Sequence, residues 1–402
     1  MGFFKKDELK LLWPFYLDAL IATILYIYPA FHILYFLEVG LSLFQIGLLS
    51  SAMSLSVLLF EVPTGAIADI FGRKLSTIIG MFASGLVLFL IFISHSFYFL
   101  LFLYFLWGLA ITFFSGATTA WRIDLLKGAN KEGLIQDVEA KMHSFFSFSF
   151  LFSGIVGAFL VKYFGLIVIW PVSGVAFFFA GFSYLLGKEN FIKKKRKKRE
   201  HLKKFISHTK KSIKYSIKNE SLFILLLSAI IATFVFAFAG QMIWYAFLQN
   251  LGFKDHWFGY LFSATMISGI FAPHFIKKFV RKVGKYKTYL SIIIGLMILF
   301  LFATNFVSTL IPALVFFFLF YSMWDFLYPA RTVFFQKFTP SEMRATITSF
   351  ESMLMSLIGI ISFPLAGWVA DTIGPQKTIF ITSFMLIPII FLYMRIKEKR
   401  LK

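Results

Sequence analysis

The sequence predicts an all-α membrane protein whose twelve transmembrane helices form two pseudo-symmetric halves of six. Hydrophobic residues make up 59% of the 402-residue chain, and its mean hydropathy of +0.81 is far above that of an ordinary soluble domain. Apolar runs of about 20 residues, long enough to cross a bilayer as a helix, recur from end to end. Because these runs lack the alternation of a membrane β-strand, helices are the spanning structure that fits.

Polar breaks divide the apolar sequence into six runs, a linker and six more runs. We expect a first half at 1–187, a basic linker at 188–220 and a second half at 221–402. The expected helices are 11–37, 43–67, 75–95, 97–124, 142–163, 166–187, 221–249, 255–277, 286–305, 307–335, 345–370 and 377–395.

A shift of 212 residues relates the two halves. Small residues recur at this one offset while the helix ends stay aligned, which predicts a parallel repeat about an axis along the membrane normal. The matched positions are Gly40 and Gly252, Gly47 and Gly259, Gly72 and Gly284, and Ser51-Ala52 and Ser263-Ala264.

The formal net charge of +21 does not indicate a nucleic-acid-binding protein, because the basic residues lie in short breaks between apolar runs. The linker and the breaks near 73–74, 277–287 and 337–344 are basic, whereas the alternate breaks carry little positive charge. The positive-inside rule then places both termini and the linker in the cytoplasm, with the chain in the cell membrane. The linker is expected either to contact anionic lipid headgroups or to be solvated, with an amphipathic helix at 201–218.

No enzyme or metal motif is present in the sequence. The chain has no Cys, and therefore no disulfide and no thiolate ligand. It contains no Walker loop, no His-Glu-x-x-His and no Gly-x-Ser-x-Gly, and its few His residues lack metal-ligand spacing. We therefore expect a non-enzymatic protein without a cofactor.

One polar stretch, Glu-Val-Pro-Thr-Gly-Ala-Ile-Ala-Asp-Ile-Phe-Gly-Arg-Lys at 61–74, separates two long apolar segments. Gly65 and Gly72 permit a close approach of backbones or a sharp turn. Asp69 and Arg73 stand four residues apart, so that they can face each other at a helix end.

This stretch resembles the loop between helices 2 and 3 of the major facilitator superfamily, in which Gly-x-x-x-Asp-x-x-Gly-Arg-Lys recurs, and every defined position through Lys74 matches. Residues 339–346, before helix 11, also resemble the facilitator pattern. In the second half the place of Asp69 is taken by Arg281, so that copy is degenerate. The resemblance implies a monomeric secondary transporter in which one half rocks against the other around a central small-molecule site.

Asp325 is the sharpest site signal. The expected cytoplasmic end of its helix is ten residues away, or about 15 Å at the helical rise, which places it near the bilayer midplane. An ionisable group at that depth costs roughly 2.5–3.5 kcal/mol. This cost favours a group that faces a cavity and carries a proton or binds a cation, and the alternative is a structural hydrogen bond to a neighbouring helix. Tyr321 and Tyr328 share its helix face, and Trp324 adjoins it.

Helices 1 and 7 occupy equivalent places in the repeat, and in the superfamily they line the central cavity. Their polar aromatic side chains suit an amphipathic or aromatic substrate, because they combine apolar faces with a few hydrogen-bonding groups. The alternative is an interfacial aromatic belt, which we expect for the outer members Tyr35 and Tyr245. His32 is either a protonation site or a hydrogen-bonded packing residue. The candidate binding residues on these helices are Tyr26, Tyr28, His32, Gln241 and Trp244.

Charged residues gather at the expected cytoplasmic ends of the helices. Asp18 and Glu351 lie roughly two turns inside their helices, where partly buried charges require partners. The layer is either an inner gate, whose ion pairs form when the cytoplasmic side closes, or a set of static ion pairs. The resemblance assigns the gate role most directly to Asp69 and Arg73. The full set is Asp18, Glu61, Gly65, Asp69, Gly72, Arg73, Lys74, Arg122, Asp124, Arg331, Arg344 and Glu351.

The aromatic sites favour export of amphipathic or drug-like compounds with proton coupling. Two departures from the drug–proton antiporter pattern weaken that prediction: Tyr104 stands where helix 4 usually carries Arg, and helix 5 lacks the Gly-Pro pair. One alternative is uptake or facilitated transport of a small polar metabolite. Alternatives of another class are a non-transporting membrane receptor or scaffold, and a lipid flippase.

Overall fold

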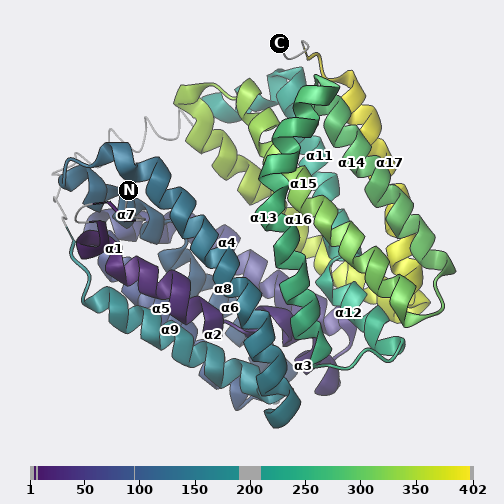
Figure 1. Cartoon of the computed structure of the whole chain (residues 1–402), viewed down its shortest axis with the longest axis horizontal. Helices are drawn as coiled ribbons and strands as arrows, with labels where there is room; N and C mark the ends of the chain where they lie inside the picture. Colours follow the sequence, from purple (N-terminus) through teal and green to yellow (C-terminus); the bar gives the residue numbers. More distant parts are fainter. Residues whose placement is uncertain (1–3, 6–7, 95, 190–209, 399–402) are drawn as a thin grey trace. The chain divides into compact units, whose positions relative to one another are not determined.

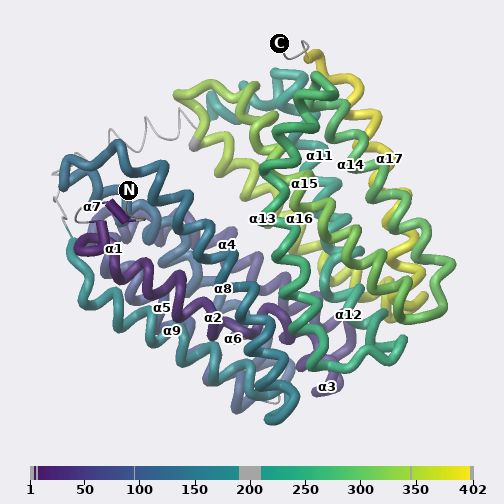
Figure 2. The backbone as a smooth tube through the Cα atoms, in the orientation of Figure 1, coloured from purple at the N-terminus to yellow at the C-terminus, as the bar shows by residue number. Residues whose placement is uncertain are grey.

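The computed structural model describes residues 4–5, 8–94, 96–189 and 210–398. Within these ranges the chain is helical without any strand, and twelve segments are long and apolar enough to span a membrane. The trace in Figure 2 follows them in order along the chain. The predicted all-α fold of twelve spans is therefore confirmed.

The first half contains spans 1 to 6 (Figure 1). Span 1 is α1 (Glu8–Leu17), the π-helical η1 (Asp18–Ala22), α2 (Thr23–Leu25), the 3-10 turn η2 (Tyr28–Ala30) and α3 (His32–Glu38); spans 2 and 3 are α4 (Leu43–Phe71) and α5 (Arg73–Phe92); span 4 is α6 (Phe97–Phe114) and α7 (Ala117–Gly128); span 5 is η3 (Glu132–Leu134) and α8 (Ile135–Phe164); span 6 is η4 (Leu166–Val168) and α9 (Ile169–Leu185).

The second half contains spans 7 to 12. Span 7 is α11 (Glu220–Phe238) and α12 (Gln241–Asn250); span 8 is α13 (Trp257–Val283); span 9 is α14 (Tyr286–Ala303) and η5 (Thr304–Phe306); span 10 is α15 (Leu310–Phe338); span 11 is η6 (Ser341–Met343) and α16 (Arg344–Ile373); span 12 is α17 (Pro375–Arg395). Of the predicted amphipathic helix in the linker, residues 210–218 are helical and 201–209 lie outside the described residues.

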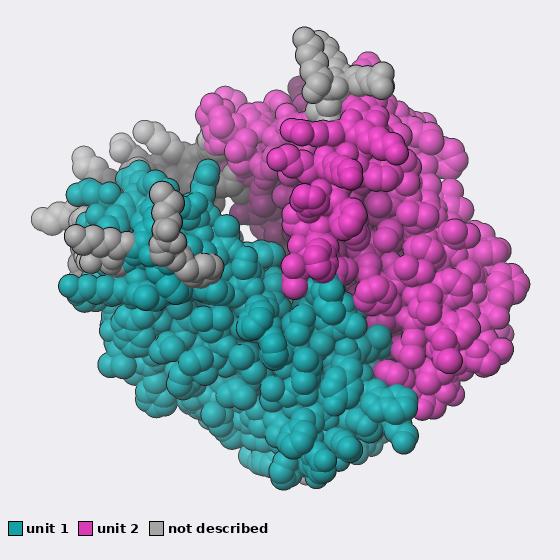
Figure 3. Space-filling model, viewed as in Figure 1, with its two compact units in different colours: residues 1–41, 48–193, 254–267 teal, residues 42–47, 194–253, 268–402 magenta. Residues whose placement is uncertain are grey.

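The structure forms two compact units, coloured separately in Figure 3. Unit 1 comprises residues 1–41, 48–193 and 254–267, and unit 2 comprises residues 42–47, 194–253 and 268–402. The first turn of α4 therefore packs with unit 2, and the first turns of α13 pack with unit 1.

The repeat is visible in the backbone and in the packing. Gly40 and Gly252, one shift apart, have φ values of 91° and 85°, and Gly72 and Gly284 have φ values of 111° and 76°. These conformations are open to Gly because it lacks a Cβ. In unit 1 the third span, α5, packs against α6 and α9, and in unit 2 its equivalent, α14, packs against α15 and α17. The two halves therefore share turns and neighbours.

Three spans predicted as single helices are interrupted. In span 1, α2 ends at Leu25, because Pro29 cannot donate to the carbonyl of Leu25 and its ring would clash there. Ser173 of α9 fills the break: its Oγ donates to the Leu25 oxygen at 3.3 Å and accepts from the Tyr28 N–H at 3.2 Å. Span 7 breaks before Gly240, where a Cβ would lie 2.0 Å from the Phe236 oxygen. Span 4 breaks between α6 and α7.

Two helices extend six or seven residues beyond a predicted end. α8 begins at Ile135, seven residues before the predicted start at 142, and α13 continues to Val283, six residues beyond the predicted end at 277. Both extensions carry charged side chains, and apolar runs alone cannot reveal helix that continues beyond the hydrocarbon layer.

Within unit 2 the last turn of α16 contacts the first turn of α4. The Asp371 carboxylate accepts from the backbone N–H groups of Leu43 and Phe44 at 3.0 and 2.8 Å. A Cβ at Gly367 would lie 2.1 Å from the Leu43 oxygen, so the two backbones touch. An acidic group at the positive end of a helix stabilises this contact.

Candidate functional site

The interruptions of spans 1 and 7 occupy equivalent positions, because the 212-residue shift places Tyr28 on Gly240. Discontinuous helices in corresponding places of two repeats mark binding sites in membrane proteins, since they free backbone groups at membrane depth. The predicted binding residues of both spans lie at or next to these breaks.

In unit 1 the break adjoins a buried aromatic cluster with unused hydrogen-bond donors. The Tyr28 ring lies 4.9 Å from that of Trp107, which in turn lies 5.5 Å from Tyr104. Tyr35 packs on Trp170 at 5.4 Å and is only 2% exposed, so the expectation that it belongs to an interfacial belt is wrong. Four buried polar groups of this cluster have no hydrogen-bond partner among the described residues: the hydroxyls of Tyr35 and Tyr104 and the indole N–H groups of Trp107 and Trp170.

Unit 2 contains a second aromatic cluster beside its break. Trp244 is fully buried against Phe317 and Phe320, and its indole N–H has no hydrogen-bond partner. Tyr245 is 1% exposed and accepts from the Gln241 amide at 2.7 Å, so it too lies in the core rather than in a belt. The indole of Trp244 is thus a buried donor beside the break in span 7.

Asp325 lies near the middle of the 29-residue α15. It is half-buried, and its carboxylate accepts from the hydroxyl of Ser268 on α13. Among the described residues it has no ion pair. The Tyr321 hydroxyl is also buried without a partner, whereas Tyr328 is 61% exposed, so these two tyrosines differ in surroundings although they are seven residues apart. Trp324 packs edge-on against Phe236 of α11. Sequence reasoning missed Ser268, because a hydroxyl in an apolar helix carries no signal of its partner.

The side chains of Tyr26 and His32 form hydrogen bonds with other residues of span 1. The Tyr26 hydroxyl lies 3.1 Å from a carboxylate oxygen of Asp18. The His32 Nδ1 lies 3.2 Å from the carbonyl of Tyr28, which also accepts from the Phe31 backbone N–H at 3.0 Å. For His32 this hydrogen bond matches the packing alternative.

The motif residues are brought together in unit 1. The Arg73 guanidinium lies 3.6 Å from Asp69 and 2.6 Å from Asp124, and it donates to the Ala120 carbonyl at 2.8 Å. Gly72 makes the turn before α5 with its positive φ. Gly65 behaves differently from the prediction, since it lies inside α4 and a Cβ there would meet nothing within 4 Å.

Each half also contains an Arg–Glu ion pair in which the guanidinium is buried. Arg122 of span 4 binds Glu139 of span 5 through Nε at 2.9 Å and Nη2 at 2.7 Å. Arg331 of span 10 binds Glu351 of span 11 at 2.6 Å and donates to the Leu225 carbonyl at 2.9 Å. The same 212-residue shift places Glu139 on Glu351. Sequence reasoning had included three members and missed Glu139, because pairing across spans requires the fold.

A second arrangement that occurs in both units is a carboxylate and a lysine at the N-terminus of the third span. In unit 1, Glu189 accepts from the Lys74 backbone N–H at 2.9 Å, while the Lys74 ammonium donates to carbonyls at the end of span 6. In unit 2, Glu398 accepts from the N–H groups of Tyr286 and Lys287, and the Lys287 ammonium donates to carbonyls at the end of span 12. Lys74 therefore ties two helix ends of one unit together.

Two predicted gate residues make no ion pair in the part of the chain that the structure describes. Glu61 is exposed on α4, and Arg344 is exposed at the first position of α16. Of the other charged members, Asp18 binds tyrosines, the Lys74 ammonium donates to backbone carbonyls, and the rest form ion pairs inside their own unit. The gate interpretation stays a prediction.

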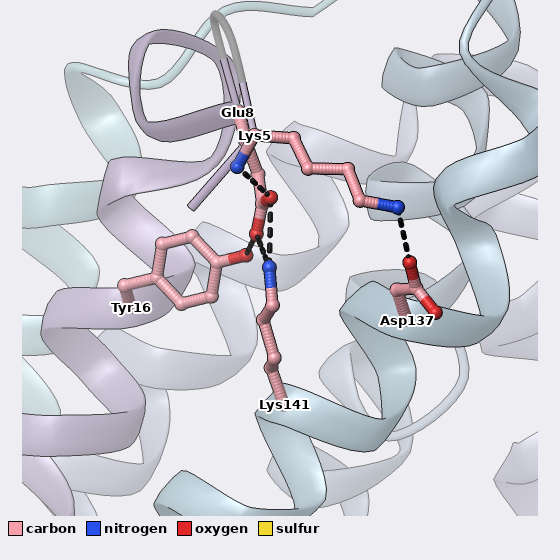
Figure 4. Close-up of polar contacts among 5 residues, drawn as sticks. All are labelled: Lys5, Glu8, Tyr16, Asp137 and Lys141. Atoms are coloured by element: carbon pink, nitrogen blue, oxygen red, sulfur yellow. Dashed lines mark hydrogen bonds and ion pairs between the residues drawn. The ribbon is translucent and has the colours of Figure 1, made fainter. Parts of the chain in front are cut away.

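A cluster near the start of span 1 was not predicted (Figure 4). Glu8 is 1% exposed, and the Lys141 ammonium contacts both its carboxylate oxygens at 2.8 Å. The Tyr16 hydroxyl donates to the same carboxylate at 2.5 Å. Lys5 adds an exposed ion pair with Asp137 at 2.5 Å. No group of three potential metal ligands occurs among the described residues.

These features define a polytopic helical membrane protein built from two repeated six-span units with interrupted first spans. The sequence model of the Major Facilitator Superfamily matches residues 15–357. The chain therefore belongs to this superfamily of transporters and is not an enzyme, as the sequence predicted.

Known proteins of similar sequence and structure agree. The chain is 25% identical over 391 residues to an uncharacterized MFS-type transporter, YxaM, of Bacillus subtilis, covering 94% of each chain. It is similar in structure to the nucleoside transporter NupG, with a TM-score of 0.77 and 14% identity over 95% of this chain and 100% of that one. It is also similar to a D-xylose–proton symporter, with a TM-score of 0.70 and 13% identity over 96% and 97% of the two chains. At these identities the solved structures establish the fold.

Proposed function

We propose that this transporter is a secondary active exporter of amphipathic or drug-like compounds that works by alternating access and is driven by protons, with Asp325 as the coupling group. The observation that carries the proposal is a half-buried carboxyl in the middle of span 10 whose protein ligand is the neutral hydroxyl of Ser268. Such a group can take up a proton or face a cationic substrate, because no basic side chain among the described residues already neutralises it.

The aromatic residues beside the breaks support a substrate with apolar faces and a few acceptors. The indole of Trp244 and the hydroxyl of Tyr321 are buried donors without partners, which is costly unless a ligand or water satisfies them. Tyr26, Tyr28, His32, Gln241, Trp324 and Tyr328 complete the proposed binding set.

We further propose that Arg73 with its partners Asp69 and Asp124, together with the two Arg–Glu pairs, forms the charged layer of an inner gate. In this proposal both termini lie in the cytoplasm, the protein contacts membrane lipids, and a monomer is the working unit. Glu61 and Arg344, exposed and without an ion pair among the described residues, are the members free to pair in another state of the cycle.

Uptake of a small polar metabolite is the second candidate. The unused donors near the two breaks are also suited to hydroxyl-rich substrates. Among the similar structures are transporters described as acting on nucleosides and on D-xylose, so the fold accommodates such substrates.

Flux in proteoliposomes with an imposed proton gradient tests these alternatives. The probes are cationic dyes beside sugars, amino acids and organic anions, with fluorescent phospholipids to detect scrambling. We expect gradient-driven dye movement that is lost in Asp325→Asn and retained in Glu132→Gln, a control that neutralises an exposed carboxylate. Wild-type flux with unchanged pH dependence in Asp325→Asn would contradict the coupling role.

The other outcomes assign the alternatives. Movement of a metabolite that ignores the proton gradient would favour facilitated uptake and reduce Asp325 to a substrate contact or a structural residue. Substrate binding without flux would indicate a receptor or scaffold, and headgroup-dependent movement of phospholipid would indicate a flippase.

A further inference from the structure

Asp18 is a buried carboxylate that the proposed coupling site does not use. It is 3% exposed and begins the π-helical turn η1, in the first half of span 1. Thr23 donates its hydroxyl to the Asp18 carbonyl at 2.9 Å across this widened turn. Single π-helical turns inside membrane or soluble helices occur frequently at functional sites.

Both carboxylate oxygens of Asp18 are bound by tyrosine hydroxyls. The Tyr26 hydroxyl lies 3.1 Å from Oδ1, and the Tyr184 hydroxyl donates to Oδ2 at 2.7 Å. Tyr26 belongs to the break after α2, and Tyr184 belongs to α9. Within the described chain no nitrogen of Lys, Arg or His lies within ion-pair distance of Asp18.

The charged groups around Asp18 do not neutralise it. η1 packs against α8 and α9. From α9 it meets Tyr184, and from the neighbouring α7 the cation that acts on it is Arg122. The Arg122 guanidinium is already bound twice by Glu139 of α8. Asp18 is therefore an acid without a counter-ion of its own.

The same unit shows how this chain neutralises a buried carboxylate that stays ionised. The Glu8 side chain is as little exposed to solvent as that of Asp18, but the Lys141 ammonium contacts both its oxygens (Figure 4). An ionised carboxylate away from water is very costly without such a partner, and uptake of a proton removes that cost.

We infer that Asp18, together with Tyr26 and Tyr184, is a proton-binding site inside unit 1. The proton adds to one carboxylate oxygen to give a neutral carboxylic acid, and no other bond is made or broken. The protonated oxygen becomes a donor, so the tyrosine hydroxyl that faces it must turn its own hydrogen away and accept the new bond.

Tyr26 is the tyrosine that turns. Its contact is longer, at 3.1 Å against 2.7 Å for Tyr184. Its backbone already has non-helical dihedrals, φ −74° and ψ 67°, at the break that leads to Tyr28. A proton on Asp18 is thereby transmitted to the interrupted segment that we propose binds substrate, and only this transmission rests on the proposed function.

Infrared difference spectroscopy of the purified, detergent-solubilised protein tests the site without any substrate. A pH change should produce the carbonyl band of a buried carboxylic acid that disappears in Asp18→Asn and remains in Asp325→Asn and in Glu8→Gln. Tyr184→Phe, which keeps the ring and removes one hydroxyl, should change the frequency of the band. This variant keeps the test decisive where Asp18→Asn fails to fold.

Several outcomes would overturn the inference. They are a spectrum without such a band at any pH at which the protein remains folded, a spectrum in which Asp18→Asn removes no part of the carboxylic acid absorption, and an Asp18 band insensitive to Tyr184→Phe. Because the measurement requires neither transport nor an intact Asp325, failure of the proposed exporter function leaves the result interpretable. A positive spectrum with flux that ignores the proton gradient would retain the site and reject the coupling role of Asp325.

Discussion

Removal of the Glu351 carboxylate should destabilise the protein far more than removal of its repeat-related counterpart, Glu139. In unit 2 the side chains of Arg331 and Glu351 are only 8% and 12% exposed. Glu351→Gln leaves the buried guanidinium with the Leu225 carbonyl and a neutral amide, while its Nε is already without a partner. Truncation of one member of a buried ion pair costs about 3–5 kcal/mol, because the remaining charge is uncompensated.

In unit 1 the equivalent change, Glu139→Gln, should lower the free energy of unfolding by a smaller amount. The Arg122 side chain that remains is only 5% exposed, but the Glu139 side chain is 34% exposed, so water at the position of Glu139 can replace part of what the carboxylate supplies to Arg122. We expect a loss of about 1 kcal/mol. For units of this size 1 kcal/mol lowers Tm by roughly 2–4 °C, which gives about 6–12 °C for a 3 kcal/mol loss in Glu351→Gln.

Thermal unfolding of the detergent-purified variants, followed by tryptophan fluorescence, measures the difference. The double variant Arg331→Met/Glu351→Met should lie near the wild type, because two apolar side chains leave no buried charge. The reasoning is refuted if Glu351→Gln unfolds no earlier than Glu139→Gln, or if the double variant unfolds below Glu351→Gln.

Three further predictions use the same assay. Gly72→Ala should lower the free energy of unfolding by about 1–3 kcal/mol, because alanine is strained at φ 111°. Gly65→Ala should be neutral or slightly stabilising, because Gly65 lies inside a helix and a Cβ there would meet no other atom within 4 Å. Equal effects of the two changes would contradict the turn argument. Asp371→Asn should lose about 0.5–1 kcal/mol through the weaker cap on α4, and an unchanged Tm would remove that role. Lys141→Met should lose about 3 kcal/mol by leaving a buried carboxylate unpaired, while Lys5→Met, at an exposed pair, should leave Tm unchanged.

The spans and the repeat could be predicted from the sequence because both depend on properties of short segments. A run of apolar residues is sufficient for a membrane helix whatever its neighbours are, and glycines such as Gly40 and Gly252 mark turns through their own backbone freedom. The pairing of Asp69 with Arg73 was also accessible, since the two residues are only four apart, across the turn at Gly72.

The partners of the buried charges could not be predicted. Glu139, Tyr184 and Ser268 are ordinary residues in apolar or amphipathic helices, and what gives them a role is the span that lies beside them. The helix breaks could be predicted only in part. Pro29 indicates the break in span 1, but the hydrogen bonds that Ser173 makes there depend on packing, since Ser173 lies 145 residues from Tyr28 in the sequence.

The two halves share their structural devices and differ in their unpaired acids. The glycine turns, the interrupted first spans, the Arg–Glu pairs and the carboxylate at the start of the third span occur in both units. Asp18 has no counterpart, since the shift places it on Ile230, and Asp325 falls on Phe113. A feature that both repeats keep is explained by folding six helices in a membrane. A carboxylate that appears once, with no cation within ion-pair distance in the described part of the chain, is not required by that shared architecture. This is why we assign proton binding to Asp18 and Asp325 and not to the Arg–Glu pairs that both units contain.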